Sequence, residues 1–97
     1  MLYSSETVQG ITFTRTNADV NGNPRYVVHF TDVLPDNYRE TLPDIRARYQ
    51  YAVKLSHRWG GSKYRGRDFG GGIVVQSYSL QETAAEINRV KAEEAAR

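Results

Sequence analysis

Alternating apolar and polar residues predict three β-strands. Ile11 and Phe13 alternate with threonines, which predicts a half-buried strand over about residues 7–15. A second alternating segment, 25–31, follows an Asn-Gly dipeptide that favours a tight turn, so we expect the two strands to be antiparallel neighbours. The apolar segment 73–78 predicts the third strand.

Two further segments have the spacing of amphipathic helices. The first is expected to begin at the capping sequence 41–44 and to run to about Trp59, before a pair of glycines. The second is expected to begin at the capping box 79–82 and to run to about Glu94. The residues predicted to face inward are Ile45, Tyr49, Ala52, Val53, Ser56 and Trp59 in the first helix and Leu80, Ala84, Ile87 and Val90 in the second.

The order of these elements, β-β-α-(β)-β-α, predicts an α+β fold. We expect a two-layer sandwich in which a three- or four-stranded, mainly antiparallel sheet carries both helices on one face, with the optional strand inside 62–72. The chain of 97 residues is expected to form a single domain over 1–97, with an ordered core at about 7–92 and a frayed C-terminal tail. The open sheet face and the sheet edges are places for a partner, including a second copy in a homodimer.

Composition excludes several classes of function. Apolar residues make up 39% of the chain, and no apolar run approaches the about 18 residues of a membrane-spanning helix. Residues 1–10 lack the charged start and apolar stretch of a secretory signal. Cysteine is absent, which excludes disulfides, thiolate metal sites and cysteine nucleophiles. We therefore expect a cytoplasmic protein that does not bind membranes.

Charge is distributed unevenly along the chain. The net charge is +2, yet residues 45–67 carry seven cations and no acid. Residues 1–44 have a net charge of −3 and residues 68–97 one of −2. Arginine is the commonest cation, and its planar guanidinium binds phosphate or carboxylate through two points and stacks on flat rings. The middle segment is therefore the part of the chain expected to bind an anionic partner.

Within this basic segment, cations are interleaved with aromatic residues over the end of the first helix and the glycine-rich loop after it. Such a combination is typical of single-strand nucleic-acid binding, because cations contact phosphates while rings stack on bases. The pattern predicts nucleic-acid binding, with Trp59 or Tyr64 as the stacking ring. An acidic protein surface would need the same positive charge, and a solvated helix face would look similar, so both alternatives stay open. The residues expected to bind nucleic acid or another partner are Arg46, Lys54, His57, Arg58, Trp59, Lys63, Tyr64, Arg65 and Arg67.

No catalytic, metal-binding or cofactor-binding motif is complete in the sequence. Gly61 and Gly66 have the spacing of a phosphate-binding loop, but neither the lysine nor the hydroxyl residue of that motif follows them. The loop also lies between a helix and a strand, where the motif needs a strand and then a helix. His29 and His57 share no metal-ligand spacing. We therefore expect a non-enzymatic binding protein without cofactor or metal.

Two stretches, NGNPRYVVHF at 21–30 and GGSKYRGRDFGGGIVVQSY at 60–78, resemble a group of small bacterial proteins associated with plasmids and phages. The similarity extends over about residues 21–90. The resemblance implies a bacterial cytoplasmic setting and an accessory role, with no activity attached. Small proteins of mobile elements commonly bind host nucleic acid or host complexes. The alternative function is therefore a phage- or plasmid-encoded protein that binds and modulates a host protein complex, as an anti-defence inhibitor does.

Overall fold

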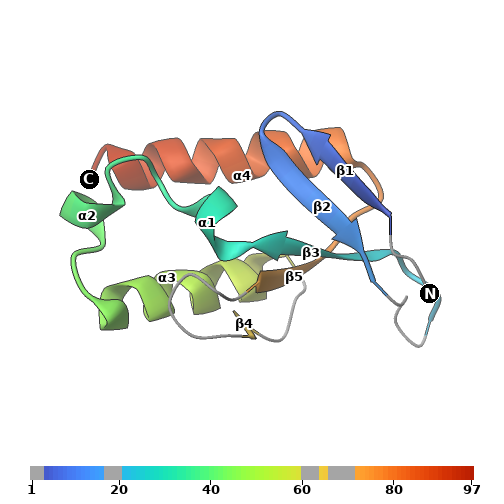
Figure 1. Ribbon diagram of the computed structural model, residues 1–97, viewed down its shortest axis with the longest axis horizontal. Coiled ribbons are helices and arrows are strands. Elements are labelled where there is room, and N and C mark those ends of the chain that lie inside the picture. Colours follow the sequence, from blue (N-terminus) through green and yellow to red (C-terminus); the bar gives the residue numbers. More distant parts are fainter. Residues whose placement is uncertain (1–3, 17–20, 60–63, 66–71) are drawn as a thin grey trace.

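The computed structural model describes residues 4–16, 21–59, 64–65 and 72–97, with the backbone alone at 64–65 (Figure 1). The described strands are β1 (Ser5–Val8), β2 (Ile11–Arg15), β3 (Arg25–His29), β4 (Tyr64–Arg65) and β5 (Gly72–Gln76). They form one sheet in the order β1-β2-β3-β5-β4, and every neighbouring pair is antiparallel. The α+β class and the antiparallel sheet are thus confirmed, and two-residue β4 is the optional strand expected within 62–72.

The first predicted strand is in fact a hairpin of two strands. β1 and β2 are joined by Gln9 and Gly10, whose φ angles are 51° and 82°. Both residues lie in the left-handed region that a two-residue hairpin turn requires, and glycine adopts it at no steric cost. The single strand predicted over 7–15 is therefore wrong, because the chain reverses in the middle of it. The extra strand, β1, forms one edge of the sheet.

Two long helices and two single-turn helices complete the described part of the chain. They are α1 (Phe30–Val33), α2 (Tyr38–Thr41), α3 (Ile45–Arg58) and α4 (Leu80–Ala95). α3 begins later than predicted because its cap is Asp44, whose carboxylate accepts a hydrogen bond from the Ala47 N–H at 2.8 Å, and not Thr41. α4 begins as predicted, since the Ser79 hydroxyl accepts a hydrogen bond from the Glu82 N–H at 3.3 Å.

The core lies between one face of the sheet and the two long helices. Strand pairing places Phe13, Val28 and Ile73 opposite one another, and all three are fully buried. Each such side chain stabilises the fold by about 1.5–3 kcal/mol. The long helices, which run along the length of the molecule in Figure 1, both cover this face because their buried residues join the same cluster. These residues are Tyr51, Ala52 and Leu55 of α3, Trp59 at its C-terminal cap, and Ala84, Ile87 and Val90 of α4.

The opposite face of the sheet is polar over β1 and β2 and carries the half-buried Val27 and Val74 at its centre, and no helix in the described ranges packs on it. Two cross-strand hydroxyl pairs lie on its β1–β2 part, Ser5 with Thr14 at 3.1 Å and Thr7 with Thr12 at 2.9 Å. Threonine suits such positions because its branched side chain fits a pleated, half-exposed surface. His29, at the end of β3, is exposed on the same face. The surfaces that remain exposed to a partner are therefore the open sheet face and the outer sides of the helices.

Candidate functional site

The outer side of α3 carries most of the predicted site residues that the structure describes. Arg46, Lys54 and His57 are exposed, and rotation by 100° per residue places them, together with Gln50, on one side of the helix. We call these four residues the basic face. α3 contains no Asp or Glu, and none of the three basic side chains forms an ion pair with a described residue. No described carboxylate therefore pairs with a cation of the basic face.

An apolar strip borders the basic face. Ile45 and Tyr49 are 64% and 57% exposed, and Val53, one turn further along, is half-buried. Because residues four apart lie above one another on a helix, the three side chains are contiguous, and we call them the apolar edge. The prediction that Ile45 and Tyr49 face inward is therefore wrong. This surface differs from the expected one, in which the aromatic residues beside the cations are Trp59 and Tyr64.

Tyr51 explains why α3 buries a different side from the predicted one. Its side chain is buried, and its hydroxyl donates a hydrogen bond to the carbonyl oxygen of Val33 at 2.8 Å. A tyrosine is readily buried when its hydroxyl finds such an acceptor. Tyr51 and Leu55 thus occupy the inward positions that helical periodicity assigned to Ile45 and Tyr49. The acceptor lies in α1, a single helical turn that the sequence pattern does not indicate.

Trp59 belongs to the core and not to the binding surface. It caps the C-terminal end of α3, is 8% exposed, and packs within the hydrophobic cluster. Its carbonyl oxygen accepts a hydrogen bond from the Gln76 N–H at 3.0 Å, which connects the helix end to β5. The prediction that Trp59 stacks on a base is therefore wrong, because a ring enclosed in the core offers no face to a ligand.

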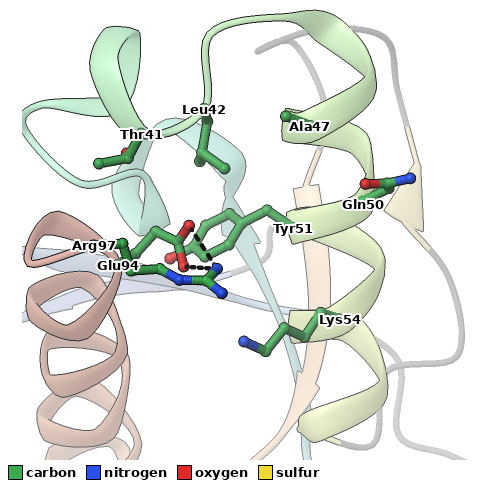
Figure 2. A pocket seen from close by; sticks show the side chains of 8 residues that line it. All are labelled: Thr41, Leu42, Ala47, Gln50, Tyr51, Lys54, Glu94 and Arg97. Carbon is green, nitrogen blue, oxygen red and sulfur yellow. Dashed lines mark hydrogen bonds and ion pairs between the residues drawn. The ribbon is translucent and has the colours of Figure 1, made fainter.

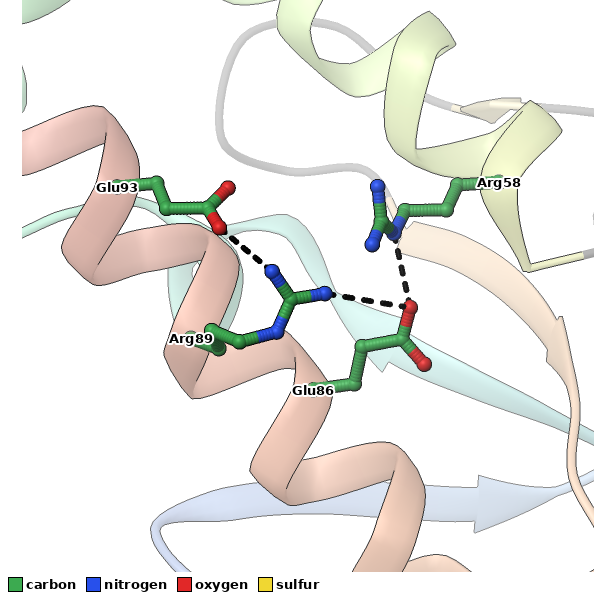
Figure 3. A network of polar contacts seen from close by, with 4 residues as sticks. All are labelled: Arg58, Glu86, Arg89 and Glu93. Atoms are coloured by element: carbon green, nitrogen blue, oxygen red, sulfur yellow. Dashed lines mark hydrogen bonds and ion pairs between the residues drawn. The ribbon is translucent and has the colours of Figure 1, made fainter.

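Arg58 forms an ion pair that bridges the two long helices (Figure 3). Its Nε lies 2.9 Å from Oε1 of Glu86 on α4, and Arg89, which also pairs with Glu93, approaches the same oxygen at 4.0 Å. The hydrogen bond from Arg58 holds the pKa of Glu86 below its usual range, and the nearby Trp59 indole N–H and the charge of Arg89 act in the same direction. Arg58 therefore offers a partner less charge than the sequence predicts.

Arg48, which falls near the buried side of α3, is also engaged within the molecule. Its Nε donates a hydrogen bond to the carbonyl oxygen of Leu42 at 2.8 Å, and its guanidinium lies 5.1 Å from the centre of the Tyr38 ring. A cation over an aromatic ring is attracted by the ring's negative face. Of the four Arg and Lys residues on α3, Arg46 and Lys54 are therefore the two exposed ones that form no ion pair or ring contact with another described residue.

Four predicted site residues are not placed by the structure. Lys63 and Arg67 lie outside the described residues, as do the side chains of Tyr64 and Arg65. The backbone of 64–65 forms β4, which pairs with the start of β5. The contribution of the glycine-rich loop to binding stays a prediction.

A pocket of about 250 Å³ opens beside the basic face, between α3 and the end of α4 (Figure 2). Burial raises the pKa of Tyr51 in its wall well above the usual range, and the negative charge of Glu94 adds to the effect. No pattern in the sequence indicates this pocket, because it forms where the end of α4 approaches α3, and these two segments are far apart in the chain. The residues that line the pocket are Thr41, Leu42, Ala47, Gln50, Tyr51, Lys54, Glu94 and Arg97.

Other kinds of site find no support within the residues that the structure describes. His29 and His57 lie on different elements, β3 and α3. No group of three or more His, Asp or Glu side chains in the described ranges is placed to hold a metal ion. Among the same residues, no helix is both long enough and apolar enough to span a bilayer. The basic face, the apolar edge and the pocket therefore make up the candidate site.

Comparison with known proteins identifies the family of the chain. Residues 6–96 match the family model described as Staphylococcus phage terminal repeat-encoded protein TreK. No curated protein and no solved structure matches the chain. The family match extends over almost all of the sequence and confirms the predicted relationship to small phage proteins. The chain therefore belongs to the family of the Staphylococcus phage terminal repeat-encoded protein TreK.

Proposed function

We propose that this phage protein is a non-enzymatic binding protein that docks on an acidic surface of a host protein through α3. The apolar edge forms the centre of the interface, and the basic face forms its charged border. The place of binding would be the bacterial cytoplasm. This function corresponds to the accessory role that the sequence offered as an alternative to nucleic-acid binding.

The exposure of Ile45 and Tyr49 beside the basic face, on a helix without any acidic residue, supports this proposal most strongly. Interface centres are enriched in aromatic residues and arginine, and a few well-packed anchors supply most of the binding energy. Complete burial of a side chain such as Ile45 contributes about 1.5–3 kcal/mol. The surrounding cations then favour an acidic partner and accelerate its association.

Charge also disfavours a homodimer through this surface. A second copy of α3 would bring a second set of cations against the first, and like charges across an interface are destabilising. A partner with carboxylates around an apolar pocket would complement both the basic face and the apolar edge. The surface therefore fits a different protein better than it fits another copy of the chain.

Nucleic-acid binding is the second candidate, supported by the exposed cations Arg46 and Lys54. It is weakened because Trp59 is buried and Arg58 is paired with Glu86, which removes one stacking ring and much of one charge. An exposed isoleucine also adds little to phosphate binding. Affinity for single strands should fall with salt with a log–log slope of about −0.7 for each neutralised phosphate.

The test places a photo-cross-linking amino acid at position 49 or at position 78 of the full chain, in staphylococcal lysate. Tyr49 and Tyr78 are both exposed, at 57% and 78%. Tyr78, however, lies between β5 and α4, and its hydroxyl donates a hydrogen bond to the side-chain oxygen of Asn23, just before β3. We expect a discrete protein adduct from position 49 that persists after nuclease treatment and is absent from position 78. Equal adducts from both positions would contradict docking through α3, and an adduct removed by nuclease would favour nucleic acid.

A pair of charge variants then tests the border of the interface. Arg46→Gln should weaken binding of the cross-linked protein about threefold and reduce its dependence on salt, because exposed pairs contribute about 0.2–1 kcal/mol each. Lys91→Gln removes the same charge from α4 and should leave the affinity unchanged. Equal effects of the two substitutions would show that net charge alone determines binding.

A further inference from the structure

The pocket beside the basic face contains a buried carboxylate. Glu94 lies in the last turn of α4, where the helix dipole disfavours negative charge, and its side chain is only 7% exposed. Within the described residues it is bonded by Arg97 alone, whose Nη1 lies 3.4 Å from both carboxylate oxygens. A buried charge requires such a partner, so Glu94 holds Arg97 at the pocket although the arginine side chain is 71% exposed.

Donors at the mouth of this pocket have no acceptor among the described residues. Arg97 uses Nη1 for Glu94, while its Nε and Nη2 bond to none of them. Lys54 and Gln50 likewise form no hydrogen bond or ion pair in the described part of the chain. Figure 2 shows Lys54 of α3 extending across the pocket toward the guanidinium of Arg97. Two cations therefore converge on one opening, an arrangement that an anion between them would stabilise.

The balance of charge indicates which anion fits. The side chains of Lys54 and Arg97 contribute two positive charges to the lining and that of Glu94 one negative charge, so a single negative charge balances the lining side chains. A phosphate carries about −1.5 to −2 at neutral pH and would leave excess negative charge beside the buried carboxylate. A pocket of about 250 Å³ is also smaller than the roughly 300–1,000 Å³ of sites for drug-sized ligands, and suits one side chain.

We infer that this pocket binds a carboxylate, supplied by an Asp or Glu side chain of the protein partner. Arg97 and Lys54 bind the carboxylate, and Glu94 is a positioning residue that acts through Arg97. Lys54 and Gln50 belong to both the pocket and the basic face, so a partner docked on α3 reaches the pocket without another element. The identity of the partner rests on the proposed function, whereas the chemistry of the pocket does not.

The experiment titrates the full chain with acetate, and separately with inorganic phosphate, at constant ionic strength set with chloride. Amide chemical shifts of residues 50–54 and 94–97 report binding. We expect saturable shifts with acetate and tighter binding of acetate than of phosphate. Lys54→Gln and Arg97→Gln should each weaken acetate binding about tenfold, the loss of one charge-assisted hydrogen bond. The control Lys91→Gln removes one positive charge from α4 outside the pocket and should change the affinity less than twofold.

Shifts that do not saturate, or equal weakening by Lys91→Gln, would overturn the inference. Tighter binding of phosphate than of acetate would overturn the assignment to a carboxylate. Lys54→Gln leaves the pair between Glu94 and Arg97 intact, so it remains a valid test if Arg97→Gln disturbs folding. This test is separate from that of the proposed function. Absence of acetate binding would overturn the pocket alone, and absence of the cross-link from position 49 would overturn docking through α3 alone.

Discussion

The two long helices bury their inner faces in the same core, yet their outer faces differ. α4 carries charges of both signs and pairs them along its surface, Glu86 with Arg89 and Arg89 with Glu93. α3 carries cations only and exposes Ile45 and Tyr49. Within the described residues the charges of α4 are thus largely paired, whereas α3 has large exposed apolar side chains and pairs only Arg58 with an acid. Amphipathic spacing alone does not distinguish the two helices, but the exposed side chains do.

The largest expected effect concerns which side of α3 is buried. Leu55→Ala should destabilise the protein by about 2–5 kcal/mol, because it leaves a cavity at a fully buried position. Ile45→Ala should cost no more than about 0.5 kcal/mol, because that side chain is exposed. Denaturant unfolding of both variants measures the difference. If Ile45→Ala lowers the free energy of unfolding as much as Leu55→Ala does, then Ile45 faces the core, as periodicity predicted.

A smaller effect separates the two candidate caps of α3. Asp44→Ala should cost about 0.5–2 kcal/mol, because the Ala47 N–H loses the carboxylate that accepts its hydrogen bond. Thr41→Ala should cost less, since its hydroxyl makes a long 3.4 Å bond to the Asn37 carbonyl and caps no helix. Ser79→Ala at the start of α4 gives the reference for a working cap. A larger loss at Thr41 than at Asp44 would mean that α3 begins earlier.

The smallest effect lies in the ion pair between the helices. Because the pKa of Glu86 is lowered in the folded protein by Arg58, its contribution is fully present above the ordinary value of 4.5 and is lost as the pH falls through the folded-state pKa. Solvent screens this half-exposed pair, so the contribution is below about 1 kcal/mol. The stability difference between wild type and Glu86→Gln should be constant near neutral pH and disappear in acid.

The control for this pH dependence is Glu6→Gln, which removes an exposed carboxylate on β1 that forms no ion pair with a described residue. Its stability difference from wild type should show no comparable change between neutral pH and acid. A Glu86→Gln profile that matches the Glu6→Gln profile would mean that the bridge contributes nothing to the fold.

Local signals predicted α4 and β3 well. The capping box at Ser79 sets the start of α4, and Ala84, Ile87 and Val90 are buried as expected. The alternation over 25–31 likewise predicts a strand, and β3 occupies residues 25–29 of it, ending where Phe30 begins α1. In these elements the local pattern and the tertiary packing favour the same answer, so no information beyond the segment itself is needed.

The remaining features depend on contacts between distant segments. Threonines lie on both sides of the turn at Gln9 and Gly10, so the two strands of the hairpin have the pattern of one continuous strand. The orientation of α3 depends on a hydrogen bond from Tyr51 to Val33, and the pocket depends on the approach of the α4 end to α3. Composition draws attention to the basic segment, but burial and ion pairing decide which of its described residues are exposed to a partner.

The central claim is that α3 is the binding surface, and the affinity of the cross-linked protein for two tyrosine variants tests it most directly. Tyr49→Ala should weaken binding about tenfold or more, as expected for an interface anchor that contributes roughly 1.4 kcal/mol or above. Tyr78→Ala, which removes an even more exposed ring, should leave the affinity within a factor of two. Equal losses in the two variants, or a loss confined to Tyr78→Ala, would contradict the claim.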